Sequence, residues 1–329
     1  MRLKEALQTC GLSRHQYYYK PQRQKRGKKP TKVTNDGLRD ISDDKLLEEI
    51  NDLRAIPDNN IGYRSICKQL HLKGYRINHK KVYRLFKEHD LLQEKPKKPP
   101  KNYVKHRQVK STRPFEVLEM DIKYEWIEKD RCHSFILTVI DTFTRVVLGW
   151  HASQKIQKQA VKDLWDDIIV NHLQPADLLN KGLRVEVRND NDKRFSAHLV
   201  QDYFKENQLD QVFTHPYTPQ ENGHIESFHA ILSRSLNKQV FYTLKDLEQH
   251  LTFFYFNYNN TRSHTSTAYL PPMVFSNLWE NQQHLFDLKV LKNNKVIIKC
   301  NTPLYNLSGL INQTEASCLN YKGSMPVVV

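Results

Sequence analysis

The second half of the chain alternates apolar and polar positions with the periods of a mixed α/β protein. From residue 118 to residue 126 every second side chain is apolar, which predicts a strand with one face in the core. Phe135–Ile140 is a nearly continuous apolar run, as expected of a central strand buried on both faces, and Val146–Trp150 follows as a third strand. Further elements are predicted as strands at 183–189 and 211–215 and as helices at about 157–172, 196–207 and 220–239. This order predicts a mixed sheet covered by helices.

Residues 31–94 have the period of helices instead. A first helix is predicted through Leu46–Leu53, with Asp43 or Asp44 as its cap. A second helix is predicted at about Tyr63–Leu72, where Gly74 ends it. This region therefore predicts a small all-α domain ahead of the α/β core.

A third helix in that domain carries most of its basic side chains. Asn78 is placed to cap a helix at about His79–His89, which keeps its apolar side chains inward. Helix, short turn and basic helix is the pattern of a helix-turn-helix, whose second helix enters the major groove of DNA. A helical bundle with an ordinary charged face is the alternative. The candidate DNA-binding residues are Arg64, His79, Lys80, Lys81, Arg84 and Lys87.

The charge of the chain lies in its first third. The 51 Lys and Arg exceed the 36 Asp and Glu by 15. Residues 1–110 hold 28 basic and 12 acidic side chains, a net charge of +16, whereas residues 111–329 have a net charge of −1. Such an arm suits a polyanion, and nucleic acid is the first candidate. Segments 21–30 and 95–113 are basic and rich in proline, which favours tethers, with DNA contact as a second interpretation.

Several classes of protein are disfavoured by composition. The apolar runs are far shorter than the roughly 20 residues of a membrane span, and the first residues do not have the pattern of a secretory signal. The five cysteines are scattered and never spaced as Cys-x-x-Cys, which argues against a disulfide framework and a structural zinc site and favours a cytoplasmic location.

Three acids stand where the predicted core could bring them together. Asp121 lies on the polar face of the first strand, Asp190 lies just past the fourth strand, and Glu226 lies on a helix. Hard divalent ions such as Mg²⁺ bind oxygen ligands, and two ions can assist phosphoryl transfer. Taken singly, each acid could equally be a solvated surface group.

The spacing of these acids resembles the DDE signature of retroviral integrases and bacterial insertion-sequence transposases. The intervals hold 68 residues between Asp121 and Asp190 and 35 between Asp190 and Glu226. The flanking motifs are similar to that family as well, at Asp141–Trp150, Tyr217–Phe228 and Tyr258–Pro272, with the helix-turn-helix at Ile61–Ile66 and Ile77–Leu85. Retroviral integrases begin with a His/Cys zinc domain, and the spacing of His and Cys here does not resemble one. The resemblance is therefore to the transposases.

The resemblance implies an architecture and an activity. It covers roughly residues 40–275 and implies a ribonuclease-H-like core at 114–275 after the helix-turn-helix domain at 31–94. The residues themselves predict the other parts, which are a basic segment at 1–30 (compatible with a partial helix-turn-helix), a linker at 95–113 and a tail or small β module at 276–329. The resemblance further implies cleavage of element ends and joining of their 3′-hydroxyls to target DNA, with two Mg²⁺ (or Mn²⁺) ions held by Asp121, Asp190 and Glu226. The implied partners are double-stranded DNA, namely element ends and target, and further copies of the chain on that DNA. A shorter protein from the same element is compatible with it, as is a bacterial, nucleoid-associated location.

Two points stay open at this stage. Asp192 stands where the family usually has glycine, so either Asp190 or Asp192 could be the second ligand. The alternative functions are a ribonuclease-H-like nuclease without strand transfer and a transposase-derived DNA-binding regulator without catalysis.

His215, His224 and His229 lie near Glu226 and are expected to be structural or to face DNA. A hairpin is expected within Leu288–Lys299.

Overall fold

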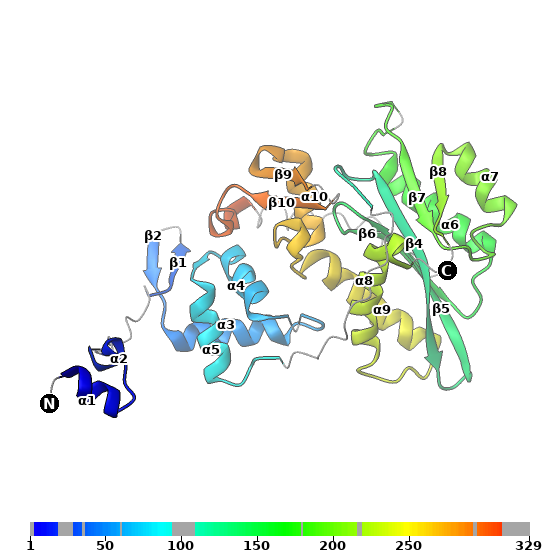
Figure 1. Ribbon diagram of the computed structural model, residues 1–329. Coiled ribbons are helices and arrows are strands. Elements are labelled where there is room, and N and C mark those ends of the chain that lie inside the picture. Colours follow the sequence, from blue (N-terminus) through cyan, green and yellow to red (C-terminus); the bar gives the residue numbers. More distant parts are fainter. Residues whose placement is uncertain are drawn as a thin grey trace.

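The structure is a computed structural model, and Figure 1 shows a helical domain beside a larger α/β core. It describes residues 3–18, 29–34, 37–59, 61–93, 109–178, 180–215, 219–291 and 295–310. Most of both predicted linkers, the hairpin tip at 292–294, Tyr217 and Thr218 of the predicted motif, and residues 311–329 lie outside these ranges.

A five-stranded mixed sheet forms the centre of the core. Its strands are β4 (Val117–Ile127), β5 (Cys132–Asp141), β6 (Val147–Ser153), β7 (Val185–Asn189) and β8 (Leu209–Phe213). Their order is β6-β5-β4-β7-β8, in which the first three pair antiparallel while β7 pairs parallel with β4 and β8 parallel with β7. The predicted mixed sheet is confirmed, because each strand found in the apolar pattern is present in it.

Helices cover both faces of this sheet, as Figure 1 shows. On one face lie α6 (Lys158–Ile168), which continues into a π-helical turn at Ile169–Leu173, and α7 (His198–Glu206). Trp165 of α6 is fully buried there and donates from its indole nitrogen to the sulfur of Met120. On the opposite face lie α8 (Gly223–Leu236) and α9 (Leu244–Asn260). The hydroxyls of Thr138 on β5 and Tyr255 on α9 lie 2.7 Å apart in that second interface.

The helical domain contains the three predicted helices, α3 (Asp43–Ala55), α4 (Tyr63–Leu72) and α5 (His79–Glu88). Asn78 caps α5 as predicted, because its side chain accepts from the backbone N–H of Lys80. The prediction of Asp43 or Asp44 as the cap of α3 is wrong. Ser42 is the extended residue whose side chain accepts from Lys45, which leaves the two acids in the first helical turn, where negative charge is favourable.

Short strands that the apolar period did not predict also belong to this region. β1 (Thr31–Thr34), β2 (Gly37–Asp40) and β3 (Tyr75–Arg76) form an antiparallel sheet in the order β2-β1-β3. β3 occupies the turn between α4 and α5, so the turn of the helix-turn-helix is tied to the segment that enters the domain. Two further helices precede it, α1 (Leu3–Thr9) and α2 (Arg14–Tyr18).

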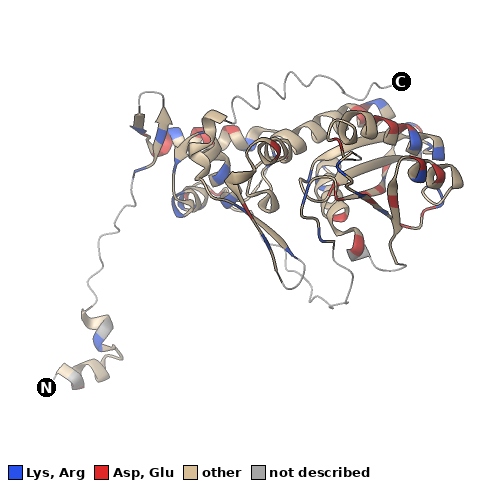
Figure 2. Cartoon of the chain, turned by 90° about the horizontal axis from the view of Figure 1, so that it is seen from above, with Lys and Arg blue, Asp and Glu red and all other residues tan. Residues whose placement is uncertain are grey.

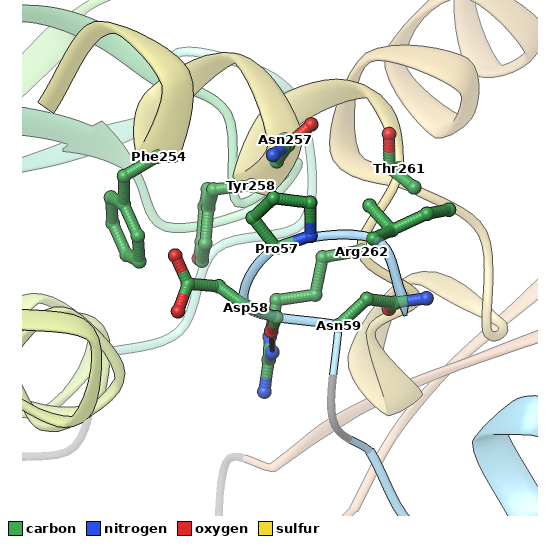
Figure 3. Close-up of a pocket in the computed structure, with 9 residues that line it drawn as sticks. Pro57, Asp58, Asn59, Phe254, Asn257, Tyr258, Thr261 and Arg262 are labelled. Atoms are coloured by element: carbon green, nitrogen blue, oxygen red, sulfur yellow. Dashed lines mark hydrogen bonds between the residues drawn. The ribbon is translucent and has the colours of Figure 1, made fainter. Parts of the chain in front are cut away.

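The helical domain docks on the core through the loop that follows α3. Figure 3 shows Pro57, Asp58 and Asn59 of this loop against Tyr258 and Arg262 at the end of α9. The backbone carbonyl of Asp58 accepts from the guanidinium of Arg262 at 2.9 Å. The carboxylate of Asp58 accepts from Ser235 of α8 at 2.7 Å and from Lys238, just after α8, at 2.6 Å. These bonds join a loop to two helices of the core far along the chain.

The C-terminal part packs between the two bodies. It comprises α10 (Pro272–Asn281) and a hairpin of β9 (Phe286–Val290) and β10 (Val296–Cys300). Phe275 and Trp279 of α10 pack with Phe286 of the hairpin, and Leu72 of α4 lies against the same apolar cluster. The predicted hairpin is thus present, and its apolar side chains face α10. No helix in the described part of the chain has both the length and the apolar character of a membrane span.

Gly149 of β6 is needed for the contact between the sheet and α6. A Cβ atom there would lie 2.9 Å from Leu164 Cδ1 and 3.1 Å from Ile168 Cγ1, and both neighbours are buried. We expect Gly149→Ala to lower the free energy of unfolding by about 1–3 kcal/mol, as overpacking of a core does. Urea denaturation measures it. Gly309→Ala is the control, since a Cβ atom meets nothing within 4 Å there. Equal stability of both variants would contradict this account of the packing.

Candidate functional site

The sheet brings two of the predicted acids to neighbouring strands. Glu119 of β4 is paired with Arg188 of the parallel strand β7. Asp121 and Asp190 each follow two residues later, so they lie at matching positions along adjacent parallel strands. Asp121 is half-buried on β4, and Asp190 is exposed just beyond the end of β7.

The third acid comes from the helix that covers this end of the sheet. Glu226 lies in the first turn of α8 and is exposed. Ile225 and Phe228, on either side of it, are fully buried against the sheet. The apolar stripe of α8 therefore fixes which way the helix faces, and Glu226 stays on its open side.

Electrostatics show how these acids are related. Burial and the nearby charges of Asp121 and Asp192 raise the pKa of Asp190. Burial, Asp121 and Glu119 raise the pKa of Glu226. Asp121 is the charge common to both, so it is the middle member of the group. Like charges this close favour either protonation or a bound cation.

The donor set suits a hard cation, because carboxylate oxygens are the ligands that Mg²⁺ and Mn²⁺ prefer. The side chains are nevertheless not gathered into a finished site. Across the described ranges, no three His, Cys, Asp or Glu side chains form a group that could hold a metal ion. The backbone thus brings the three acids to one region, whereas their side-chain positions are not those of ligands around an ion.

Asp192 is engaged in a different interaction. Its carboxylate accepts from Arg194, from the backbone N–H at 2.8 Å and from the guanidinium at 2.9 and 2.5 Å. The hydrogen bonds from Arg194 lower the pKa of Asp192, whereas that of Asp190 is raised. Arg194 is itself held by the hydroxyl of Tyr124 at 3.2 Å and lies over the ring of Phe135. Asp192 therefore has a cationic partner within the chain.

Glu119 is a member of this region that the sequence interpretation missed. Its side chain is 0% exposed, although it lies on the polar face of β4 with Asp121. One carboxylate oxygen accepts from the backbone N–H groups of His224 at 3.0 Å and Ile225 at 2.7 Å, and the other lies 2.8 Å from His224 Nδ1. Burial raises the pKa of Glu119 to about 7. An acid two positions before Asp121 was the available signal, but alternation assigned it only to a face.

Each of the three histidines near Glu226 lies beside a different carboxylate. His224 binds Glu119, and His215 lies 3.0 Å from a carboxylate oxygen of the buried Glu221. His229, one turn after Glu226, has its Nδ1 3.4 Å from Asp121 Oδ2. A second contact between α8 and β4 thus falls on Asp121 itself.

The predicted DNA-binding residues lie on α5 and the start of α4. His79, Lys80 and Lys87 are exposed, while Lys81 and Arg84 are half-buried and form ion pairs with Asp43 of α3. Arg64 of α4 is connected to α5 through Tyr63, which accepts from Arg64 Nε and also stacks on His79. Of the six residues, Lys81 and Arg84 are already paired with an acid.

The net charge of the helical domain is close to zero, and Figure 2 shows both signs of charge intermixed on it. Residues 31–94 hold 12 basic and 11 acidic side chains. Residues 1–30 hold 9 basic and 1 acidic side chain, and residues 95–110 hold 7 basic and none acidic. The positive charge of the first third thus belongs to the segments on either side of the domain.

Three models of known domains match the chain. An integrase core domain matches residues 111–219, a second integrase core domain matches residues 207–272, and an HTH-like domain matches residues 42–99. Among solved structures, the catalytic domain of Mos1 mariner transposase is similar at 14% identity with a TM-score of 0.37, covering 43% of this chain and 70% of that one. The HTLV-2 integrase catalytic core domain in complex with magnesium is similar at 15% identity with a TM-score of 0.35, covering 51% and 97%.

Proteins of bacterial insertion elements are similar along most of the chain. An uncharacterized 39.2 kDa protein of IS476 from Xanthomonas euvesicatoria is 28% identical over 225 residues, which are 68% of this chain but only 62% of that protein. The putative transposase InsK of IS150 from Escherichia coli is 23% identical over 84% of this chain and 93% of its own length. The IS904 transposase from Lactococcus lactis is 25% identical over 64% of this chain and 85% of its own length. The chain thus combines an HTH-like domain with an integrase core that follows it, and it is similar to transposases of bacterial insertion elements.

Proposed function

We propose that this chain is a DNA transposase that cleaves the ends of an insertion element and joins their 3′-hydroxyls to target DNA. One observation carries the proposal: within an integrase core, Asp190 just past β7 and Glu226 on α8 both neighbour the charge of Asp121 on the adjacent strand β4. Phosphoryl transfer depends mostly on positioning the reactants and on stabilising the charge that develops. The reaction therefore needs no nucleophilic side chain.

Asp121, Asp190 and Glu226 are the residues proposed to hold the metal ions, two Mg²⁺ or Mn²⁺. Bound ions supply the charge stabilisation and activation that cleavage and joining of a phosphodiester require. The chain's own part is to keep three carboxylates close together against their repulsion, which raises the pKa of two of them. Asp190 is preferred to Asp192 as the second ligand, because Arg194 already neutralises Asp192.

DNA is the proposed partner of the helical domain. Helix α5 would enter the major groove, with His79, Lys80 and Lys87 free to contact bases and phosphates. The basic segments on both sides of the domain would add phosphate contacts of no sequence preference. Further copies of the chain on the same DNA complete the proposed assembly, since an element has two ends to be joined. A shorter protein from the same element is a further proposed partner.

Glu226→Gln tests the catalytic assignment. Removal of one ligand charge should reduce both cleavage and joining roughly a hundredfold or more, since even outer partners of a metal site cost 10–100-fold. DNA binding, measured by fluorescence anisotropy, should stay unchanged. The control is Glu206→Gln, an exposed acid at the end of α7. Full joining of element ends by Glu226→Gln with Mg²⁺ would refute the assignment, and cleavage without joining by the natural chain would favour the nuclease alternative.

Asp190 and Asp192 can be distinguished by isothermal titration calorimetry, in which Mn²⁺ is titrated into the full chain. Asp190→Asn should weaken Mn²⁺ binding about tenfold or more, because it removes a ligand. Asp192→Asn should bind Mn²⁺ within about threefold of the natural chain, since that carboxylate faces Arg194. The reverse pattern would make Asp192 the ligand.

Lys80 tests the DNA-binding face. Lys80→Ala should weaken binding to element-end DNA and lower the slope of log affinity against log salt by about 1, as the loss of one phosphate contact does. Lys45→Ala, an exposed lysine on α3, is the matched control. Equal affinities and slopes for the two variants would remove α5 from the DNA interface.

A further inference from the structure

We propose that Glu119 and His224 are positioning residues, which hold α8 on β4 so that Glu226 stands opposite Asp121. This inference rests on the proposed function, because it concerns the geometry of the same three acids. Neither residue is assigned to touch DNA or metal. Their part is to set the distance between one strand and one helix.

The start of α8 depends on Glu119 for its hydrogen bonds. The first N–H groups of a helix have no partners within the helix. Asn222, the residue before α8, makes no capping bond with its side chain and has φ −107° and ψ 35°. Glu119 supplies the missing acceptor from another element, since it accepts from the N–H groups of His224 and Ile225. A carboxylate at this end is also favoured by the helix dipole.

His224 closes the arrangement from the helix side. Its Nδ1 lies 2.8 Å from the second oxygen of Glu119. One carboxylate oxygen thus contacts the backbone of His224 and Ile225, and the other contacts the His224 ring. A fully buried carboxylate with fewer partners would be costly. The bonds therefore have a preferred geometry, and a slip of α8 along β4 would break several of them together.

The positions of these residues give the contact its relevance to the acids. Glu119 lies two residues before Asp121 on the same face of β4, and His224 lies two residues before Glu226 on α8. The contact between Glu119 and His224 therefore fixes the two short segments that carry two of the three acids. His229 makes the next contact along α8, to Asp121 at 3.4 Å. Both contacts couple the same helix to the same strand.

Another polar contact on this face of the sheet provides a matched comparison. Thr138 of β5 and Tyr255 of α9 share a buried hydrogen bond of 2.7 Å between a strand and a helix. Neither β5 nor α9 carries one of the three acids, but Thr138 is paired with Asp121 across the strands, so the bond is removed at Tyr255 instead. A loss of stability alone should follow when this bond is removed, whereas loss of the Glu119 contact should also alter the metal site.

The experiment measures Mn²⁺ affinity by calorimetry on the full chain without DNA, together with the turnover of end joining. Glu119→Gln and His224→Ala should each weaken Mn²⁺ binding and slow joining about tenfold or more, with DNA affinity within about twofold. His224→Gln should recover most of both losses, because its amide can still donate to Glu119. Tyr255→Phe removes the bond to Thr138 from the α9 side, and it should lower the melting temperature and leave Mn²⁺ affinity within about twofold.

His224 is partly exposed at the surface, so its variants should fold even where Glu119→Gln does not. Unchanged Mn²⁺ affinity and turnover in His224→Ala would overturn the inference. An equal loss of affinity in Tyr255→Phe would overturn it as well, since it would trace the effect to general stability. Failure of the natural chain to join ends would instead refute the proposed function, and Mn²⁺ affinity would then still report on the contact.

Discussion

A buried carboxylate that accepts the first hydrogen bonds of a helix is the interaction on which the arrangement of this core depends. Glu119 lies within the sheet, and α8 begins where its oxygens can receive N–H groups. The apolar stripe of α8 alone would allow the helix to slide along β4, because dispersion contacts have little directional preference. Hydrogen bonds to a buried charge are directional and strong. They therefore convert a packed helix into one with a defined register.

That register brings like charges together, which is unfavourable in the absence of cations. Burial and the charge of Asp121 raise the pKa of both Asp190 and Glu226, and Asp192 is neutralised by Arg194 close by. The strong hydrogen bonds at Glu119 and the apolar clusters on both faces of the sheet hold the acids in place despite this repulsion. The core thus holds the backbone of all three acids through buried contacts around them.

The sheet and its covering helices were predictable because they depend on the local period of apolar residues, whereas the three acids were singled out by their spacing along the chain and stay a prediction. The burial of Glu119 was not predictable, since alternation assigns a residue to a face but not to the helix, 105 residues later, that covers it. The cap at Ser42 was missed because its neighbours Asp43 and Asp44 are equally good capping residues by type. The docking through Asp58 depends on contacts between distant segments, which leave no periodic signal.

The docking of the loop at Asp58 on α8 and α9 has a consequence for the distance along DNA between the sequence that α5 would contact and the three acids. It joins the domain that carries α5 to a helix that also carries Glu226, through bonds to Ser235 and Arg262. The distance from the recognised DNA sequence to the three acids is then set by the protein and not by the DNA between them. With this contact intact, the chain would act at a constant number of base pairs from the sequence it reads, whatever the intervening bases are.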